Sequence, residues 1–489
     1  MLKKQKVKIK KRGIKKYHNF RGVDSNLKEF IHSFRDPIVY FDPDVDGCIA
    51  GLFMCKLLNM LGKHFDWYIN SHRSHDWSIP VEKLKGRDVL AVDFIITADK
   101  IQELVDSGCN IVSIDHHTNG NTFIEYSNNG VKGLVINNQY SFEDEDARYL
   151  SGAGVVFESI VSMFPEFDTK LNRALVGITL LSDVRDIENP LAEYYLSELY
   201  THKYEGYIKY LIDSTMGDID YGFGLPRMDR DYVDYKFSPA INACLRFNKQ
   251  EEVVNFFLGK QPLDTKYRDA QKDLVREILS KLQVIELSNV RVCYFYEKDF
   301  LKYGDILSSF VGLVASKKLD GVHSAICYMI GEEPTGSLVV RRASFRGNIN
   351  GLDYQRVLSC LFRCLGHKSA FGIKDIVPCK NTFVKANRLC KGIEENSNYT
   401  KKVIKVVNMS LFVNKGAYEI AEDNLYALSQ NKVHIDYIGK NILRKRSGAN
   451  YAEYLVDGIP VKCFDLKLNF DNGLILPTLD RGLLTFYLE

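Results

Sequence analysis

The sequence has no hydrophobic run long enough to cross a bilayer, and its basic N-terminus leads into no apolar segment typical of a signal peptide. Its eleven cysteines are scattered and form no repeated CxxC pair of the kind that binds zinc. Cysteines spaced in this way are expected to stay reduced. We therefore expect a protein without membrane contacts that is cytoplasmic, or located in the host cytoplasm if its origin is viral.

Two motifs that would indicate other chemistries are also missing. The sequence contains no G-x-S-x-G segment and no Walker A loop, so neither acyl transfer through a serine nor NTP-driven work is indicated. The small net charge of +3 hides an uneven distribution, because residues 3–16 contain nine Lys and Arg residues. The basic arm, residues 1–20, is either a solvated tail or a contact for nucleic-acid phosphates.

Short apolar runs alternate with helical patterns over the first third of the chain, which predicts a parallel, doubly wound α/β sheet. Helical periodicity is found in residues 47–61 and 98–108. The predicted strands are residues 37–42, 65–70, 88–94, 110–115 and 132–137.

The 489 residues are too many for one hydrophobic core, so several domains are expected. Helical patterns dominate from residue 150, strands return at residue 290, and short β segments dominate from about residue 398. We predict a basic arm (1–20), a first α/β domain (21–200), a helical connector (201–288), a second, smaller α/β domain (289–395) and a C-terminal β domain (396–489).

Acidic and histidine side chains follow several of these apolar runs. In an open parallel sheet, ligands bind at the carboxyl ends of the strands. Clustered carboxylates repel one another unless cations compensate them, and carboxylates with one or two histidines suit Mn2+ or Mg2+. The residues concerned are Asp42, Asp44 and Asp46, then Asp93, then Asp115 with His116 and His117, and finally Asp183 after the apolar run "ALVGITLLSD".

Each of these pieces has an ordinary structural explanation when taken alone. A D-x-D-G segment is usually a solvated turn, and an Asp after a strand is usually a helix N-cap. Four such pieces, each expected at the carboxyl end of a strand, favour a metal site instead.

Together the motifs resemble those of the DHH phosphoesterases, and most closely the RecJ-type single-strand exonucleases. "FDPDVDG" (41–47) is similar to D-x-D-x-D-G, and the strand-ending Asp93, "DHH" (115–117) and Asp183 resemble the other three motifs. The resemblance extends over about residues 37–373 through "LSGAGVVFE" (150–158), "FSPAINACLRF" (237–247), "SFR" (344–346) and "GHKSAFG" (366–372). Tyr40, Ala240, Leu245 and Leu365 stand where the family pattern has His, Arg, Gly and Gly.

The resemblance implies two metal sites. Asp44 and Asp93 would hold one ion, and Asp46, Asp93, His116 and Asp183 the other. Asp42 would replace the missing first histidine, Asp115 would orient the histidine pair, and His117 would face the scissile phosphate. The implied chemistry is hydrolysis of a phosphodiester by a metal-activated water. The implied substrate contacts are Asn242, Arg246, Ser344, Arg346, Gly366 and His367.

The leading hypothesis is therefore a metal-dependent 5′ to 3′ exonuclease that acts on single-stranded DNA and releases mononucleotides. A phosphodiesterase of the same family acting on short oligonucleotides or cyclic dinucleotides is the first alternative, and a non-catalytic nucleic-acid-binding relative is the second. The expected partners are single-stranded nucleic acid and proteins of DNA replication, repair or recombination, and we expect a monomer. The C-terminal β domain would be OB-like, like the domain that follows the second lobe in RecJ-type enzymes, and would grip the strand through aromatic and basic residues.

Overall fold

Apolar residues near the N-terminus form a parallel sheet in the computed structural model. Strands β1, β3 and β4 are buried along their whole length, as expected for strands covered on both faces. The strand order is β2-β1-β3-β4-β6-β5, and only β5 runs antiparallel to its neighbour. The strands are β1 (Ile38–Phe41), β2 (Asp66–Ile69), β3 (Val89–Val92), β4 (Ile111–Asp115), β5 (Glu125–Asn128) and β6 (Val131–Asn137).

The structure describes residues 25–395 apart from short gaps, and beyond them the strands of the C-terminal part with a few neighbouring residues. The predicted basic arm lies outside the described residues. The gaps before residue 395 are 71–76, 78, 85, 118–124, 129, 140–144, 184–188, 202–205, 217–227, 229, 321, 350–351, 375 and 377.

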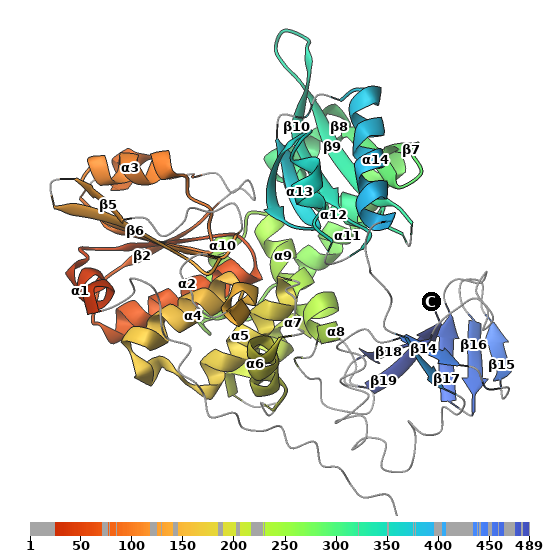
Figure 1. Ribbon diagram of the computed structural model, residues 1–489, viewed down its shortest axis with the longest axis horizontal. Helices are drawn as coiled ribbons and strands as arrows, with labels where there is room; N and C mark the ends of the chain where they lie inside the picture. Colours follow the sequence, from red (N-terminus) through yellow and green to blue (C-terminus); the bar gives the residue numbers. More distant parts are fainter. Residues whose placement is uncertain are drawn as a thin grey trace, which may run out of the picture.

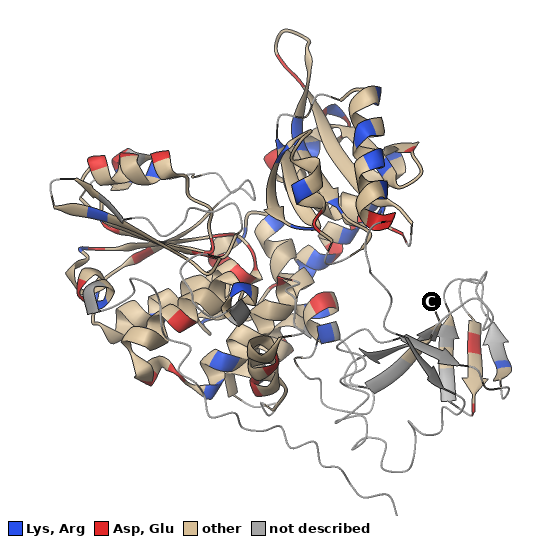
Figure 2. Cartoon of the chain, viewed as in Figure 1, with Lys and Arg blue, Asp and Glu red and all other residues tan. Residues whose placement is uncertain are grey.

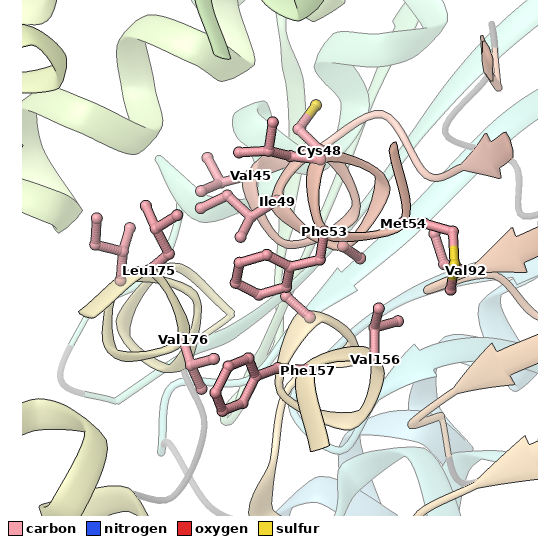
Figure 3. Close-up of a cluster of buried hydrophobic side chains, with 14 of the residues drawn as sticks. Val45, Cys48, Ile49, Phe53, Met54, Val92, Val156, Phe157, Leu175 and Val176 are labelled. Atoms are coloured by element: carbon pink, nitrogen blue, oxygen red, sulfur yellow. The ribbon is translucent and has the colours of Figure 1, made fainter. Parts of the chain in front are cut away.

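Helices cover both faces of the first sheet (Figure 1). One face packs on α2 (Val45–Met60), α4 (Gly152–Met163) and α5 (Lys170–Ser182), and the other on α3 (Ala98–Asp106). Phe53 and Phe157 meet at the centre of the first layer, where each contributes about 1.5–3 kcal/mol by burial (Figure 3). The predicted parallel α/β sheet is confirmed, whereas the β5–β6 hairpin was not predicted.

The order of the strands reverses between β1 and β3. The chain passes from β1 through α2 to β2 on one side, and β3 then pairs on the other side of β1. This switch point leaves a crevice at the carboxyl ends of β1 and β3, where ligands bind in such sheets. Asp42 directly follows β1 and Asp93 directly follows β3, so both residues lie at this crevice.

The sequence-based placement of Asp183 at the end of a strand was wrong. The apolar run before it forms α5, and Asp183 is the C-cap of that helix. A short, continuous apolar run is compatible with either a buried strand or a buried helix, so its pattern alone could not decide between them.

Helices continue from the first sheet to a second lobe. They are α1 (Ser25–Ser33) at the start of the described chain, α6 (Pro190–Thr201), α7 (Gly206–Met216), α8 (Arg230–Tyr232), α9 (Ser238–Arg246), α10 (Gln250–Phe257) and α11 (Lys266–Lys281), with a π-turn, η4 (Val233–Phe237), before α9. Short 3₁₀ turns occur at η1 (Val81–Leu84), η2 (Glu145–Tyr149) and η3 (Pro165–Phe167). Among the described residues, no helix is both long and apolar enough to span a membrane.

The second lobe is a mixed sheet in the order β11-β12-β10-β9-β8-β7. Its strands are β7 (Gln283–Glu286), β8 (Val290–Tyr296), β9 (Ser324–Glu332), β10 (Leu338–Arg346), β11 (Arg363–His367) and β12 (Ala370–Lys374). Helices α13 (Tyr354–Leu358) and α14 (Lys380–Glu395) pack on one face. The other face packs on α11, η5 (Glu297–Phe310) and α12 (Val311–Ser316).

The C-terminal part contains a seven-stranded sheet in the order β13-β14-β18-β19-β17-β16-β15 (Figure 1). Much of the chain between its strands lies outside the described residues, so the OB-like assignment stays a prediction. The strands are β13 (Val403–Val406), β14 (His434–Tyr437), β15 (Ile442–Ser447), β16 (Ala452–Val456), β17 (Ile459–Cys463), β18 (Ile475–Asp480) and β19 (Leu483–Leu488).

Close packing of α2 on β1 gives the first testable prediction. A Cβ atom at Gly51 would lie 2.7 Å from the ring of Phe41, whereas one at Gly392, in α14, would meet nothing within 4 Å. Alanine favours a helix interior by about 1 kcal/mol, but overpacking a core costs about 1–3 kcal/mol. Gly51→Ala should therefore lower the midpoint of chemical denaturation and Gly392→Ala should not. A stabilised Gly51→Ala protein would contradict this packing.

Candidate metal centre

Three aspartates at the end of β1 have different structural roles. Asp42 directly follows the strand and is buried, with 4% of its surface exposed. Asp44 is the N-cap of α2, and its carboxylate accepts a hydrogen bond from the Gly47 amide at 2.9 Å. Asp46 lies in the first turn of α2 with 2% of its surface exposed. Asp42 thus follows the strand, Asp44 caps the helix, and Asp46 places a buried carboxylate in its first turn.

Asp46 is held by the N-terminus of a second helix. Its two carboxylate oxygens accept hydrogen bonds from the backbone amides of Gly152, at 2.7 Å, and Ala153, at 2.9 Å. These amides open α4, where the helix dipole also favours a negative charge. The sequence "SGAG" therefore supplies a cradle for a carboxylate that is distant in the sequence.

Asp93 follows β3 with a positive φ of 53°, which is uncommon for a residue other than glycine. Its Oδ1 lies 3.1 Å from Nε2 of His116. A Cβ atom at Gly152 would stand 2.2 Å from the same Oδ1, so only glycine lets α4 approach this closely. Asp93 Oδ1 is buried and accepts no hydrogen bond of good geometry from the described part of the chain.

His116 directly follows β4, and its ring lies between Asp46 and Asp183, the residue at the end of α5. Its Nδ1 lies 3.7 Å from Oδ2 of Asp183, and its Nε2 lies 3.9 Å from Oδ2 of Asp46. Ligand atoms of Asp46, His116 and Asp183 all lie within 4.8 Å of one another, a spacing that one cation could bridge. A second such group consists of Asp93, Asp115, His116 and His117.

The second histidine is oriented by the aspartate before the pair. Nδ1 of His117 and Oδ1 of Asp115 form a hydrogen bond of 2.7 Å. Burial alone would lower the pKa of His117, but the carboxylate of Asp115 raises it to about 9. Burial acts in the opposite sense on Asp115, whose pKa is nevertheless held below its usual range by His117. In the absence of a cation, Asp115 therefore favours the protonated form of His117.

Two of the clustered carboxylates, those of Asp46 and Asp93, have raised pKa values. Burial is the largest cause that raises the pKa of Asp46, followed by the charges of Asp183 and Asp44. Burial also raises the pKa of Asp93, together with the neighbouring carboxylates, first among them Asp46. A divalent cation would relieve this repulsion. The donor set of carboxylate oxygens with imidazole nitrogens fits Mn2+ or Mg2+.

The second lobe closes this cluster from the opposite side. Nε2 of His367, on β11, lies 2.9 Å from Oδ1 of Asp183, and the His367 ring stacks on His117 with centroids 5.1 Å apart. A cavity of about 180 Å³ lies between the lobes. Its walls include Asp42, Asp44, Asp93 and Asp183 from the first lobe, and Ser344, Arg346, Gly366 and His367 from the second.

Most of the predicted substrate contacts therefore meet the predicted metal ligands in one cavity. Arg246 also lines it, and its guanidinium donates to Oε1 of Gln271 at 2.6 Å. Asn242, on α9, is half-buried and is not among the cavity-lining residues that the structure describes. Tyr40, at the position of the family's first histidine, instead packs with Trp77 and Phe94 on the α3 side of the sheet.

Sequence reasoning missed part of the second-lobe wall. Arg342, Ser308, Ser309 and Gly312 also line the cavity. A Cβ atom at Gly312 would stand 2.5 Å from the guanidinium of Arg346, so α12 lies directly against this arginine. Arg342, Ser344 and Arg346 are spaced two residues apart along one strand, so their side chains point to the same face. This spacing was the sequence signal that could have predicted Arg342 as a lining residue.

A buried hydroxyl pair connects the two helices that carry the centre. Oγ of Ser151 caps α4 by accepting from the Gly154 amide at 3.2 Å, and it lies 2.7 Å from Oγ1 of Thr179 on α5. The hydroxyl of Thr179 donates its hydrogen bond to the carbonyl of Val176, so the hydroxyl of Ser151 is the donor in the Ser151–Thr179 pair. The bond ties the helix that holds Asp46 to the helix that ends at Asp183.

Comparison with known proteins agrees with this geometry. Residues 38–182 match the DHH family, N-terminal domain. The RecJ of Thermus thermophilus in complex with Mn2+ superposes with a TM-score of 0.62 at 17% identity, covering 96% of this chain and 70% of that one. Its complex with Mg2+ gives 0.58 at 16% identity, covering 96% and 68%. No curated protein sequence matches the chain.

A further structure, exonuclease RecJ bound to manganese, gives a TM-score of 0.51 at 16% identity and covers 77% of this chain and 96% of that one. At such identities the solved structures establish a shared fold. The fold and the cluster are those of a mixed α/β protein with a candidate metal-binding centre. Residues 38–182 match the DHH family, N-terminal domain, the fold of the chain is similar to that of RecJ, and the resemblance to the DHH phosphoesterases that the sequence motifs indicated is thereby supported.

The raised pKa of Asp93 gives a prediction for the metal-free protein. As the pH rises above about 4, the unfolded chain loses this proton before the folded protein does, so folding stability falls up to the raised pKa. Asparagine cannot ionise. Asp93→Asn in chelator at neutral pH should therefore melt at or above the wild-type temperature, and Mn2+ should raise the melting temperature of the wild type more than that of the variant.

Differential scanning fluorimetry with and without EDTA measures both effects. A variant that melts well below wild type in chelator would mean that Asp93 stabilises the fold by itself, and that the carboxylates are not held in mutual repulsion.

The Ser151–Thr179 bond gives a third prediction, about metal affinity. Thr179→Val keeps the shape of the side chain but removes the acceptor for Ser151, whereas Thr179→Ser keeps the hydroxyl. Because partners behind metal ligands typically tune affinity 10–100-fold, we expect Thr179→Val to weaken Mn2+ binding by about tenfold. Calorimetric titration with Mn2+ tests this. Equal affinities of the Val and Ser variants would mean that the bond only supports packing.

Proposed function

We propose that the protein is a metal-dependent exonuclease that removes mononucleotides from the 5′ end of single-stranded DNA. The observation that carries the proposal is the shared cavity, in which the acidic and histidine cluster of the first lobe faces Arg346 and His367 of the second. A phosphodiester is the kind of group that needs cations on one side and guanidinium or imidazole donors on the other.

The proposed metal ligands are Asp44, Asp46, Asp93, His116 and Asp183, with Asp42 beside them, for two Mn2+ or Mg2+ ions. Bound metal would supply an activated water and stabilise charge on the phosphate oxygens. The protein's own contribution is positioning: α4 amides fix Asp46, and Asp115 orients His117. His117, buried at the cavity wall and oriented by Asp115, is placed to face the scissile phosphate.

On the second lobe, Arg346 and Gly366 form the proposed grip on the substrate. Nη1 of Arg346 donates to Oγ of Ser344 and to the carbonyl of Phe345, both at 2.7 Å, which fixes the plane of the guanidinium. Gly366 has φ +135°, a conformation that other residues rarely adopt, so its backbone can approach a ligand closely. A terminal phosphate held here would sit a fixed distance from the metal cluster.

A phosphodiesterase of small substrates, such as short oligonucleotides or cyclic dinucleotides, is the second candidate. It is favoured by Leu365, a bulky side chain that lines the cavity where the family pattern has glycine. The C-terminal sheet favours the longer strand, since Tyr454 and Arg444 face each other across β15 and β16. Other proposed contacts of that domain lie outside the described residues.

The deciding experiment is incubation with Mn2+ of a long single strand labelled at its 3′ end, beside a cyclic dinucleotide and a blunt duplex. We expect a ladder of strands shortened from the 5′ end, slow action on the duplex, and complete loss of activity in EDTA. Faster cleavage of the cyclic dinucleotide with survival of the long strand would assign the small-substrate function instead. Undiminished hydrolysis in EDTA would refute metal dependence. The same assay with RNA distinguishes the two nucleic acids.

A further inference from the structure

One part of the second-lobe sheet faces the cavity between the lobes. Ala343, Phe345, Phe371, Ile373 and Cys364 point to the core beneath α13 and α14. Successive side chains in a strand point to opposite faces, so the residues that alternate with these point the other way. On β8 and β9 that other face packs on α11 and α12. On β10, β12 and β11 it contributes to the second-lobe wall of the cavity, and α12 lies against Ser344 and Arg346 of β10.

Strand register arranges the side chains on this cavity-side face in three rows. Nearest the metal cluster, Arg346 pairs with Ala370 and Ala370 with His367. The next row joins Ser344, Gly372 and Leu365. In the third row, Arg363 pairs directly with Lys374, and Arg342 lies one step beyond the pair Ala343–Ile373, which aligns it with Lys374.

We propose that this third row, Arg342, Lys374 and Arg363, is a binding site for the backbone phosphates of a single-stranded nucleic acid whose end occupies the cavity. The inference rests on the proposed nuclease function and adds the path by which the strand leaves the site. Arg342 itself lines the cavity, so the row is continuous with the site already described.

Charge is the first argument for this occupant. Three cationic residues share one row here, with Arg363 directly opposite Lys374. A polyanion lying across the row would meet all three side chains. The acidic residues that line the cavity all come from the first lobe, among the described residues, so this face of the second lobe is of one sign. Figure 2 shows further basic residues along α14, on the opposite side of the sheet.

Distance is the second argument. Four residues along a strand span about 13 Å, which separates the third row from Arg346 and His367. Stacked nucleotides advance about 3.4 Å each, so the row lies within about four nucleotides of the end held in the cavity. A dinucleotide is too short to use the row fully, and a longer strand is not. The site would therefore favour strands over small substrates.

The test uses a matched pair of double variants of the full chain. Arg363→Ser with Lys374→Ser removes two charges from the row. Arg356→Ser with Lys385→Ser removes two from exposed positions on α13 and α14, which cover the opposite face. Binding of an octanucleotide labelled at its 3′ end is measured by anisotropy in EDTA at several salt concentrations. Hydrolysis of the octanucleotide and of a dinucleotide is compared in Mn2+.

Each lost phosphate contact on a single strand lowers the salt slope by about 0.7, which at 0.1 M salt is about fivefold in affinity. We expect the row variant to bind the octanucleotide at least about tenfold more weakly, and its preference for the octanucleotide over the dinucleotide to fall similarly. The control variant should match wild type. The thermal transitions of both double variants check that each protein is folded.

If both double variants bind the octanucleotide equally more weakly than wild type, the row contributes only as general surface charge and the proposal is overturned. Unchanged octanucleotide binding by the row variant would overturn it as well. If the wild type binds the strand through the row but hydrolyses no nucleic acid, the proposed nuclease function fails and the row stands. If the wild type hydrolyses both substrates and the row variant keeps its preference for length, the nuclease function stands and the row fails.

Discussion

Mutual repulsion among buried carboxylates is the constraint on which the site depends. Asp46 and Asp93 lie within one buried cluster, and burial together with neighbouring negative charges raises the pKa of each. A purely hydrophobic environment would make burial of these carboxylates very unfavourable, because an unpaired buried charge has a large free-energy cost. The sheet instead places them at its switch point, where helix amides, His116 and a divalent cation can compensate the charge.

The compensation comes from segments far apart in the sequence. The amides at the start of α4 bind Asp46, and the absence of a side chain at Gly152 lets the same helix approach Asp93. Ser151 then ties this helix to α5, which ends at Asp183. The ligands thus do not rest on a single loop. They are set by two helices whose relative position is fixed by the core around Phe157 and by one buried hydroxyl pair.

Sequence reasoning located the cluster because each motif sits at an end of a regular element, where local signals are strong. Asp42, Asp93 and Asp115 do follow parallel strands, as the alternation of apolar runs predicted. Asp183 was expected at the end of a strand, although the segment from residue 150 is mostly helical in pattern, and it instead ends α5. A buried helix and a buried strand have the same apolar composition over ten residues, so the run before Asp183 did not decide between them. The row Arg342, Lys374 and Arg363 could not be predicted, since it exists only once the register of three strands is known.

The two lobes divide the charges that phosphodiester chemistry requires. The first lobe contributes carboxylates that hold cations, and the facing surface of the second contributes guanidinium, lysine and imidazole groups. Among the described residues, His367 contacts Asp183 across the cavity. In the proposed function, a phosphate in the cavity would replace this contact and would bind both sides at once, to the cations through its oxygens and to Arg346 through the same group. A neutral ligand of the same shape would make neither interaction, so the division of charge between the two lobes would itself select for a phosphodiester.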